Sequence, residues 1–403
     1  MAVLLVVFVT LVFVYSLVSA RLARTVVTPP ILFTTAGIAL AFVQEPSVRG
    51  GNPEVLLLRV AEVGLVLLLF TDASRTDLRV LRSIQNLPIR LLSTGLLLTI
   101  VLGALVGLGV FRHLSIWEAG ILGAILAPTD AGLGQIIVGS PRVPVRVRQA
   151  LNVEAGLNDG LCVPFLMFFM AGDGARLAPF VAEQLVYGAL VGGGIGLAGG
   201  WLLGRARQRA WMAESFQQLG VVALPAFCVL ASEAVGASMF IAAFVAGLLV
   251  QVGFGEAGRH SVEFAEEWGQ LLNLSVFFLF GMLVARAWPQ FEPGFVIYAF
   301  LSLTLVRMVP VAIALAGSRL GNATVLFMGW FGPRGLASIV LGLVYLEEEV
   351  HSPGEPTIRL AVMATVLLSI LAHGLSARPG IDWYAARLVA LAPAAPEAPS
   401  SPT

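Results

Sequence analysis

The sequence contains no lysine, so all 24 of its basic residues are arginines. They are matched by 24 acidic residues, and charged residues make up only 12% of the 403-residue chain. Soluble domains carry about 25% charged residues, so the composition excludes an ordinary soluble domain. The balanced charge also gives no basic surface for nucleic acid and no acidic tail.

Cysteine and histidine are also scarce. The two cysteines, Cys162 and Cys228, both lie in apolar segments, where cysteine usually packs as a small hydrophobic side chain. The four histidines are scattered, without the spacing of metal ligands. No nucleophile–base pair is apparent. We therefore expect no disulfide framework, metal centre or cofactor, and an enzyme is a weak alternative.

Hydrophobic residues make up 58% of the chain, and its mean hydropathy is +0.91. A helix that crosses a bilayer needs about 20 consecutive apolar residues. Windows of this kind recur along the whole sequence and predict an all-α polytopic membrane protein with about 13 transmembrane helices. The predicted spans are 1–20, 27–44, 54–72, 88–111, 116–139, 145–171, 178–204, 216–233, 236–254, 265–286, 293–317, 321–347 and 356–376.

The arginines predict the orientation of these spans. With the N-terminus outside, sixteen arginines fall at inner ends and five at outer ends, a clear positive-inside bias. We therefore expect a multi-pass protein of the inner (cytoplasmic) membrane with its C-terminus in the cytoplasm. The other three, Arg59, Arg307 and Arg334, lie within spans, and the last two are deep enough to need acceptors.

The span 145–171 contains acidic residues at membrane depth. A charged side chain there costs about 2.5–3.5 kcal/mol on insertion scales and usually serves a function. Glu154 and Asn158 are four residues apart and share a helical face, whereas Asp159 is rotated by about 100° from Asn158. Our hypothesis is that Asp159 is a binding site exposed to a cavity, supported by Glu154 and Asn158, which face protein.

Two spans contain helix-breaking residues. In the fifth span, Pro128 is followed by Thr129 and Asp130, and in the twelfth, Gly332–Gly335 reads Gly-Pro-Arg-Gly and contains Arg334. Spans five and twelve cross the membrane in opposite directions, as inverted repeats require. Paired interrupted helices at matching positions are the best sequence indication of a transporter's binding site.

These motifs resemble a known family. Ala127-Pro-Thr-Asp-Ala, Pro141-Arg-Val-Pro-Val-Arg, Glu154 with Leu157-Asn-Asp-Gly, and Gly332-Pro-Arg-Gly resemble monovalent cation:proton antiporters, and most closely the electroneutral bacterial sodium/proton exchangers (NhaP-like). The resemblance covers about residues 1–385. It implies a homodimer in the lipid bilayer, thirteen helices with two unwound, crossing ones, and exchange of Na⁺ or Li⁺ for H⁺.

The resemblance also implies a domain organisation. A membrane transport domain is expected over 1–387. Its core, ion-binding helices would lie at approximately 54–171 and 265–376, interleaved with dimerisation helices at approximately 1–44 and 178–254. The proline-rich end of the chain, 388–403, is expected to be a disordered cytoplasmic tail.

Four residues are implied as the ion-binding set. Asp159 resembles the ion-binding aspartate and Asn158 the amide that precedes it in the electroneutral branch. Thr129 and Asp130 match the pair at the unwound helix, and Asp159 and Thr129 would contact Na⁺ directly. For Asp130 two roles stay open: binding the ion through water, or neutralising the dipoles of helix ends that cross beside it.

Glu154 and Arg334 match a buried ion pair that, in the family, holds Asn158. Electrogenic relatives use a lysine in the core domain, so the absence of lysine agrees with one-for-one exchange. Two positions depart from the family's pattern: Ala155 stands where relatives often have serine, and Thr71 where they often have glutamate.

The expected mechanism is competition for one carboxylate. If Asp159 carries either H⁺ or Na⁺, and only these loaded forms cross, exchange is coupled and electroneutral. Alternatives are an antiporter with K⁺ preference, an organic-anion/sodium symporter on an inverted-repeat scaffold, and a channel without proton coupling. The channel would need a continuous polar lining, whereas polar residues concentrate at one level here.

Overall fold

The computed structural model describes residues 2–23, 25–43, 53–75, 86–172, 177–255, 258–347 and 352–389. Regular structure in these ranges is helical throughout. The helices are α1 (Ala2–Leu22), α2 (Pro29–Val43), α3 (Pro53–Arg75), α5 (Asn86–Arg90), the π-helical turn η1 (Leu91–Gly95), α6 (Leu96–Val110), α7 (Ile116–Ile125), α8 (Ala131–Val138), α9 (Val145–Ala171), α10 (Leu177–Gln208), α11 (Glu214–Val235), α12 (Met239–Gly253), α13 (Gly258–Ala287), the 3₁₀ turn η3 (Trp288–Gln290), α14 (Pro293–Leu303), α15 (Leu305–Ala314), α16 (Asn322–Trp330), α17 (Leu336–Glu347) and α18 (Glu355–Val389).

Each predicted span lies on one of these helices or on a run of consecutive ones. Within the described residues, eight helices are long and apolar enough to cross a membrane, and further apolar helices are shorter. The all-α polytopic fold is therefore confirmed. Of the expected tail, residues 390–403 lie outside the described residues, and α18 continues to Val389.

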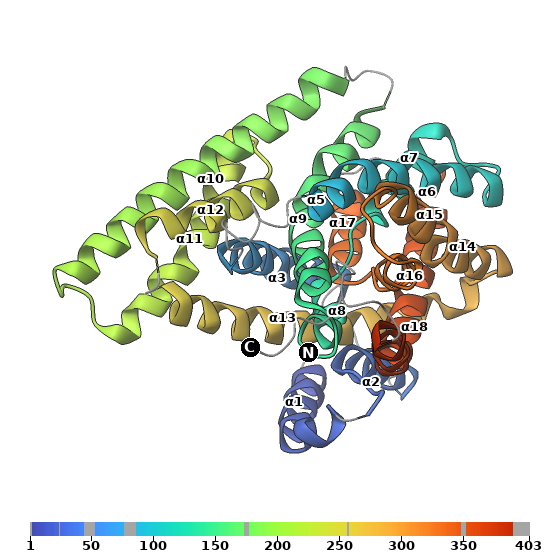
Figure 1. The fold of residues 1–403 in the computed structure, drawn as a ribbon, viewed down its shortest axis with the longest axis horizontal. Coiled ribbons are helices and arrows are strands. Elements are labelled where there is room, and N and C mark those ends of the chain that lie inside the picture. Colours follow the sequence, from blue (N-terminus) through green and yellow to red (C-terminus); the bar gives the residue numbers. More distant parts are fainter. Residues whose placement is uncertain are drawn as a thin grey trace.

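The helices form two groups with α9 between them (Figure 1). In one group, α12 packs against α10, α11 and α3, and α13 packs against α2 and α3. In the other group, α6 packs against α7, α14 and α15, while α18 packs against α14 and α17. Because α9 contacts α7 and α8 on one side and α10 and α12 on the other, its acidic residues lie between the two groups.

Helices α10 and α12 pack through glycine. Gly192, Gly196, Gly200 and Gly204 follow each other at four-residue intervals on α10. A Cβ atom at any of them would lie within 2.1–2.6 Å of a backbone oxygen of α12. The two backbones therefore touch, as is typical where small residues line a membrane helix interface.

Both predicted interruptions are present. The first separates α7 from α8 at residues 126–130, and the second separates α16 from α17 at residues 331–335. Pro128 and Pro333 lie within these segments and lack the backbone N–H that a continuous helix needs. The predicted spans 116–139 and 321–347 are thus each made of two half-helices with a non-helical segment between them.

Candidate functional site

The two interruptions meet at Asp130. Its backbone N–H donates to the carbonyl oxygen of Pro333 at 2.8 Å. Its carboxylate Oδ1 accepts from the N–H groups of Gly132 at 2.7 Å and Leu133 at 3.1 Å, and Oδ2 accepts from Leu336 N–H at 2.6 Å. One buried carboxylate therefore caps the N-termini of both α8 and α17 and opposes their partial positive charge.

These contacts distinguish between the two roles left open for Asp130. Three backbone N–H groups occupy its two carboxylate oxygens, which supports the dipole-neutralising role over binding of an ion. Gly335 explains how the carboxylate comes so close to α17. A Cβ atom at this position would lie 1.9 Å from Asp130 Oδ2, so only glycine leaves room for the cap.

We expect Gly335→Ala to lower the free energy of unfolding by about 1–3 kcal/mol, because the added methyl group displaces the Asp130 carboxylate from α17. Melting of the purified protein in detergent measures the loss. Gly342→Ala, within the adjoining helix α17, is the matched control, since its Cβ would meet its nearest neighbour, Val362, at an ordinary 3.5 Å. Equal melting temperatures for the two variants would contradict the assigned cap.

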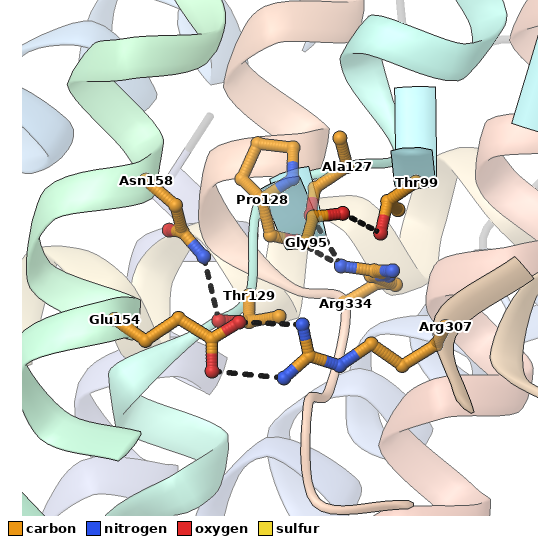
Figure 2. A network of polar contacts seen from close by, with 9 residues as sticks. All are labelled: Gly95, Thr99, Ala127, Pro128, Thr129, Glu154, Asn158, Arg307 and Arg334. Carbon is orange, nitrogen blue, oxygen red and sulfur yellow. Dashed lines mark hydrogen bonds and ion pairs between the residues drawn. The ribbon is translucent and has the colours of Figure 1, made fainter. Parts of the chain in front are cut away.

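Arg334 binds the opposite kind of helix end. Its Nη1 donates to the carbonyl oxygens of Ala127 at 2.5 Å and Pro128 at 2.9 Å, just beyond the C-terminus of α7 (Figure 2). Arg334 is fully buried. Carbonyl oxygens at a helix C-terminus lack partners within the helix and carry partial negative charge, which a guanidinium stabilises. Arg334 and Asp130 therefore neutralise opposite ends of the interrupted helices.

The expected ion pair between Glu154 and Arg334 is wrong. Glu154 is instead paired with Arg307 of α15, through Nη1–Oε1 at 2.5 Å and Nη2–Oε2 at 2.9 Å (Figure 2). Both side chains are at most 4% exposed. The physical reason is that the unsatisfied carbonyls after α7 already engage Arg334. Arg307 reaches Glu154 by lying against Gly332, where a Cβ atom would come within 2.2 Å of its Nε.

Asn158 is attached to the first interruption. Its Nδ2 donates to Thr129 Oγ1 at 2.7 Å, and both side chains are buried (Figure 2). The Oδ1 atom of Asn158 is also buried, and no hydrogen bond to it is found among the described residues. This hydrogen bond holds the Asn158 amide against the Thr129 hydroxyl at the level of the break. Asn158 is therefore held by Thr129, in place of the expected Glu154–Arg334 ion pair.

Asp159 follows directly on α9 and is 5% exposed. Ala155, one turn earlier on the same helical face, lines a small pocket together with Thr129, Asp130 and residues of α8. Side chains one helical turn apart are separated by about 5–6 Å. The pocket lining thus includes residues of both interruptions and the α9 turn before Asp159, but Asp159 itself is not among the lining residues.

Residues 7–383 match the profile of the family described as "Sodium/hydrogen exchanger, transmembrane". The chain belongs to the sodium/hydrogen exchanger family. The family resemblance drawn from the motifs is confirmed, and the chain is a multi-pass membrane protein of a transporter family.

Named relatives differ in the ion they are named for. A Schizosaccharomyces pombe protein named as a probable Na⁺/H⁺ antiporter is 27% identical over 75% of this chain and 43% of its own length. The K⁺/H⁺ antiporter NhaP2 of Shewanella oneidensis is 25% identical over 64% of this chain and 46% of its own length. The chain thus spans less than half the length of these relatives.

A solved structure has the same fold. The sodium proton antiporter MjNhaP1 of Methanocaldococcus jannaschii matches with a TM-score of 0.76 over 95% of this chain and 98% of its own, at 16% sequence identity. The expected sodium/proton antiporter fold, with its two interrupted helices, is confirmed by this match.

The two departures from the family's pattern have different surroundings. Thr71 of α3 is buried, and its hydroxyl donates within its own helix, to the carbonyl oxygens of Leu67 and Leu68. Ala155 contributes a methyl group to the pocket wall instead of a hydroxyl. The side chain of Asp72, next to Thr71, lies outside the described part of the structure.

Sequence reasoning missed the partner of one contributor to the site and two further contributors altogether. Arg307 was recognised as needing an acceptor, but nothing in the sequence gave the distance from α15 to Glu154. Ser369 and His373 of α18 contact the second interruption. The available signal was their four-residue spacing, which places two polar side chains on one face of an apolar helix.

Proposed function

We propose that the protein exchanges a monovalent cation for H⁺ across a membrane by alternating access, with both ions competing for Asp159. The observation that carries the proposal is the meeting of two interrupted, oppositely capped helices beside the Asn158–Asp159 pair of α9. Family membership and the antiporters among the relatives support it.

The cation would be bound by oxygen atoms. Alkali cations are hard and prefer carboxylate, hydroxyl and carbonyl oxygens. We assign the Asp159 carboxylate, Thr129 Oγ1 and Asn158 Oδ1 to this role, with water from the pocket completing the shell. The 2.7 Å hydrogen bond between Asn158 and Thr129 fixes two of these groups relative to each other. Asp130 supports the site by capping and does not bind the ion in this proposal.

The fixed charges around the site favour electroneutral, one-for-one exchange. Glu154 is held by Arg307, and Asp130 and Arg334 are each held by helix ends, so none of these four needs to change its charge during transport. Asp159 with one proton and Asp159 with one monovalent cation carry the same charge. The neutral Asn158 and the absence of lysine leave no second group of the kind that electrogenic relatives use.

Na⁺ is the first candidate, with Li⁺ as a congener and K⁺ as the alternative that the Shewanella relative's name supports. An organic-anion symporter fits less well. The interrupted helices contribute oxygen atoms to the centre of the site, while the buried guanidinium groups of Arg307 and Arg334 are directed to Glu154 and to backbone carbonyls.

We further propose a homodimer in the inner membrane, with the N-terminus outside and the C-terminus inside. The packing of α3 against α12 and of α13 against α2 supports assigning 54–72 and 265–286 to the dimerisation helices, and not to the core as the family resemblance implied. The moving core would then consist of α5 to α9 and α14 to α18.

Transport in vesicles tests this function. With a pH-sensitive dye enclosed, we expect an added gradient of Na⁺, Li⁺ or K⁺ to change the internal pH, and a change of anion to have no effect. An imposed membrane voltage should leave the rate unchanged, because no net charge moves. A voltage-dependent rate would contradict electroneutrality, and cation flux without any pH change would indicate a channel.

A further inference from the structure

Two polar side chains of α18 hold the second interruption. Ser369 and His373 are buried, at 0% and 2% exposure. Ser369 Oγ accepts from the backbone N–H of Arg334 at 2.7 Å, and His373 Nε2 lies 2.9 Å from the carbonyl oxygen of Trp330. The pair thus contacts the residue that ends α16 and the residue two positions before α17 begins.

These contacts form a continuous set of hydrogen bonds. Each ring nitrogen of His373 faces a carbonyl oxygen: Nε2 lies 2.9 Å from Trp330 O and Nδ1 lies 3.0 Å from Ser369 O. A carbonyl oxygen only accepts and the neutral ring has one N–H, so the tautomer decides which of these two contacts is a hydrogen bond. The Ser369 hydroxyl lies 3.1 Å from Nδ1 and accepts from the backbone N–H of Arg334, so it links His373 to Arg334 with either tautomer.

This set of hydrogen bonds continues to the first interruption. The backbone N–H of Arg334 donates to Ser369 Oγ, and its guanidinium donates to the carbonyl oxygens of Ala127 and Pro128, immediately before Thr129. A shift of α18 relative to the second interruption would therefore move the carbonyls next to Thr129. No other residue in the described structure is shown to bond both to α18 and to the segment that carries Thr129.

We propose that Ser369 and His373 are positioning residues that set the cation affinity by fixing Thr129 through Arg334. The proposal rests on the cation/proton exchange inferred above. It assigns α18, which contributes no ligand, the task of holding the two interruptions in register with Asn158.

Affinity measured separately from turnover tests this assignment. In Ser369→Ala and His373→Leu we expect the KM for the cation to rise about fivefold, the loss corresponding to one net hydrogen bond, with the maximal rate changed less than twofold. Ser369→Thr keeps the hydroxyl and should restore the KM. Thr365→Ala is the matched control, because this buried hydroxyl one turn away donates within α18, to Ala361.

A second readout does not need turnover. The rise in melting temperature on adding NaCl, compared with choline chloride, reports cation binding and should weaken in Ser369→Ala but not in Thr365→Ala. Unchanged KM with a reduced maximal rate, or equal effects in the Thr365 control, would overturn the positioning role while leaving the exchange function intact. Absence of exchange in the unmodified protein would overturn both.

Discussion

Asp159→Asn is expected to abolish cation-driven pH change in vesicles while the amount of folded protein stays near that of the unmodified chain. Asparagine has nearly the same shape as aspartate but cannot exchange a proton for a cation at neutral pH. Removing a charge from a position that is 5% exposed also removes a desolvation cost, so folding should not suffer. Dye fluorescence after addition of Na⁺, Li⁺ or K⁺ measures the effect.

Asp382→Asn is the control for this substitution. It makes the same chemical change at an exposed carboxylate of α18, which is paired with Arg142. Exposed ion pairs contribute at most about 1 kcal/mol, so we expect both folding and exchange to persist. Exchange that survives in Asp159→Asn would exclude this carboxylate as the shared site.

Glu154→Gln is expected to have the largest effect on folding. The substitution leaves the guanidinium of Arg307, itself 4% exposed, without its negative partner. Breaking a buried ion pair in this way costs about 3–5 kcal/mol, a large part of the stability of a typical domain. We expect little folded protein after membrane extraction, measured by size-exclusion chromatography of a fluorescent fusion.

The double variant Glu154→Gln, Arg307→Met separates charge from packing. Removing both charges at similar volume is often neutral, so the double variant should recover most of the folded protein. A single variant that folds as well as the double one would show that the Glu154–Arg307 pair is not important for stability. Exchange by the recovered double variant would show in turn that the pair serves folding alone.

The sequence was sufficient to predict the membrane spans because their signal is local. An apolar run of about 20 residues has few interpretations other than a membrane-spanning helix. Each predicted window coincides with helix in the described structure. The interruptions were predictable for the same reason, since Pro128 and Pro333 act on their own backbone. Their pairing followed from the odd offset between the two spans.

Partners between distant helices were less predictable. Glu154 and two deep arginines were recognised, but choosing between Arg307 and Arg334 required the distances from α9 to α15 and α17. The family pattern favoured Arg334, whereas the structure engages Arg334 with the carbonyls of the first interruption. Which carbonyl oxygens remain unsatisfied at a helix break depends on the geometry of the crossing, which a single sequence does not contain.

The glycine contact between α10 and α12 restricts how the protein can rearrange. Where two main chains touch through Gly192, Gly196, Gly200 and Gly204, no long side chains are present that could adopt new rotamers during sliding. We expect these two helices to move together as one rigid unit. Conformational change during transport must then take place elsewhere, at interfaces such as those between α9 and its neighbours. Cross-linking α10 to α12 should therefore leave turnover intact.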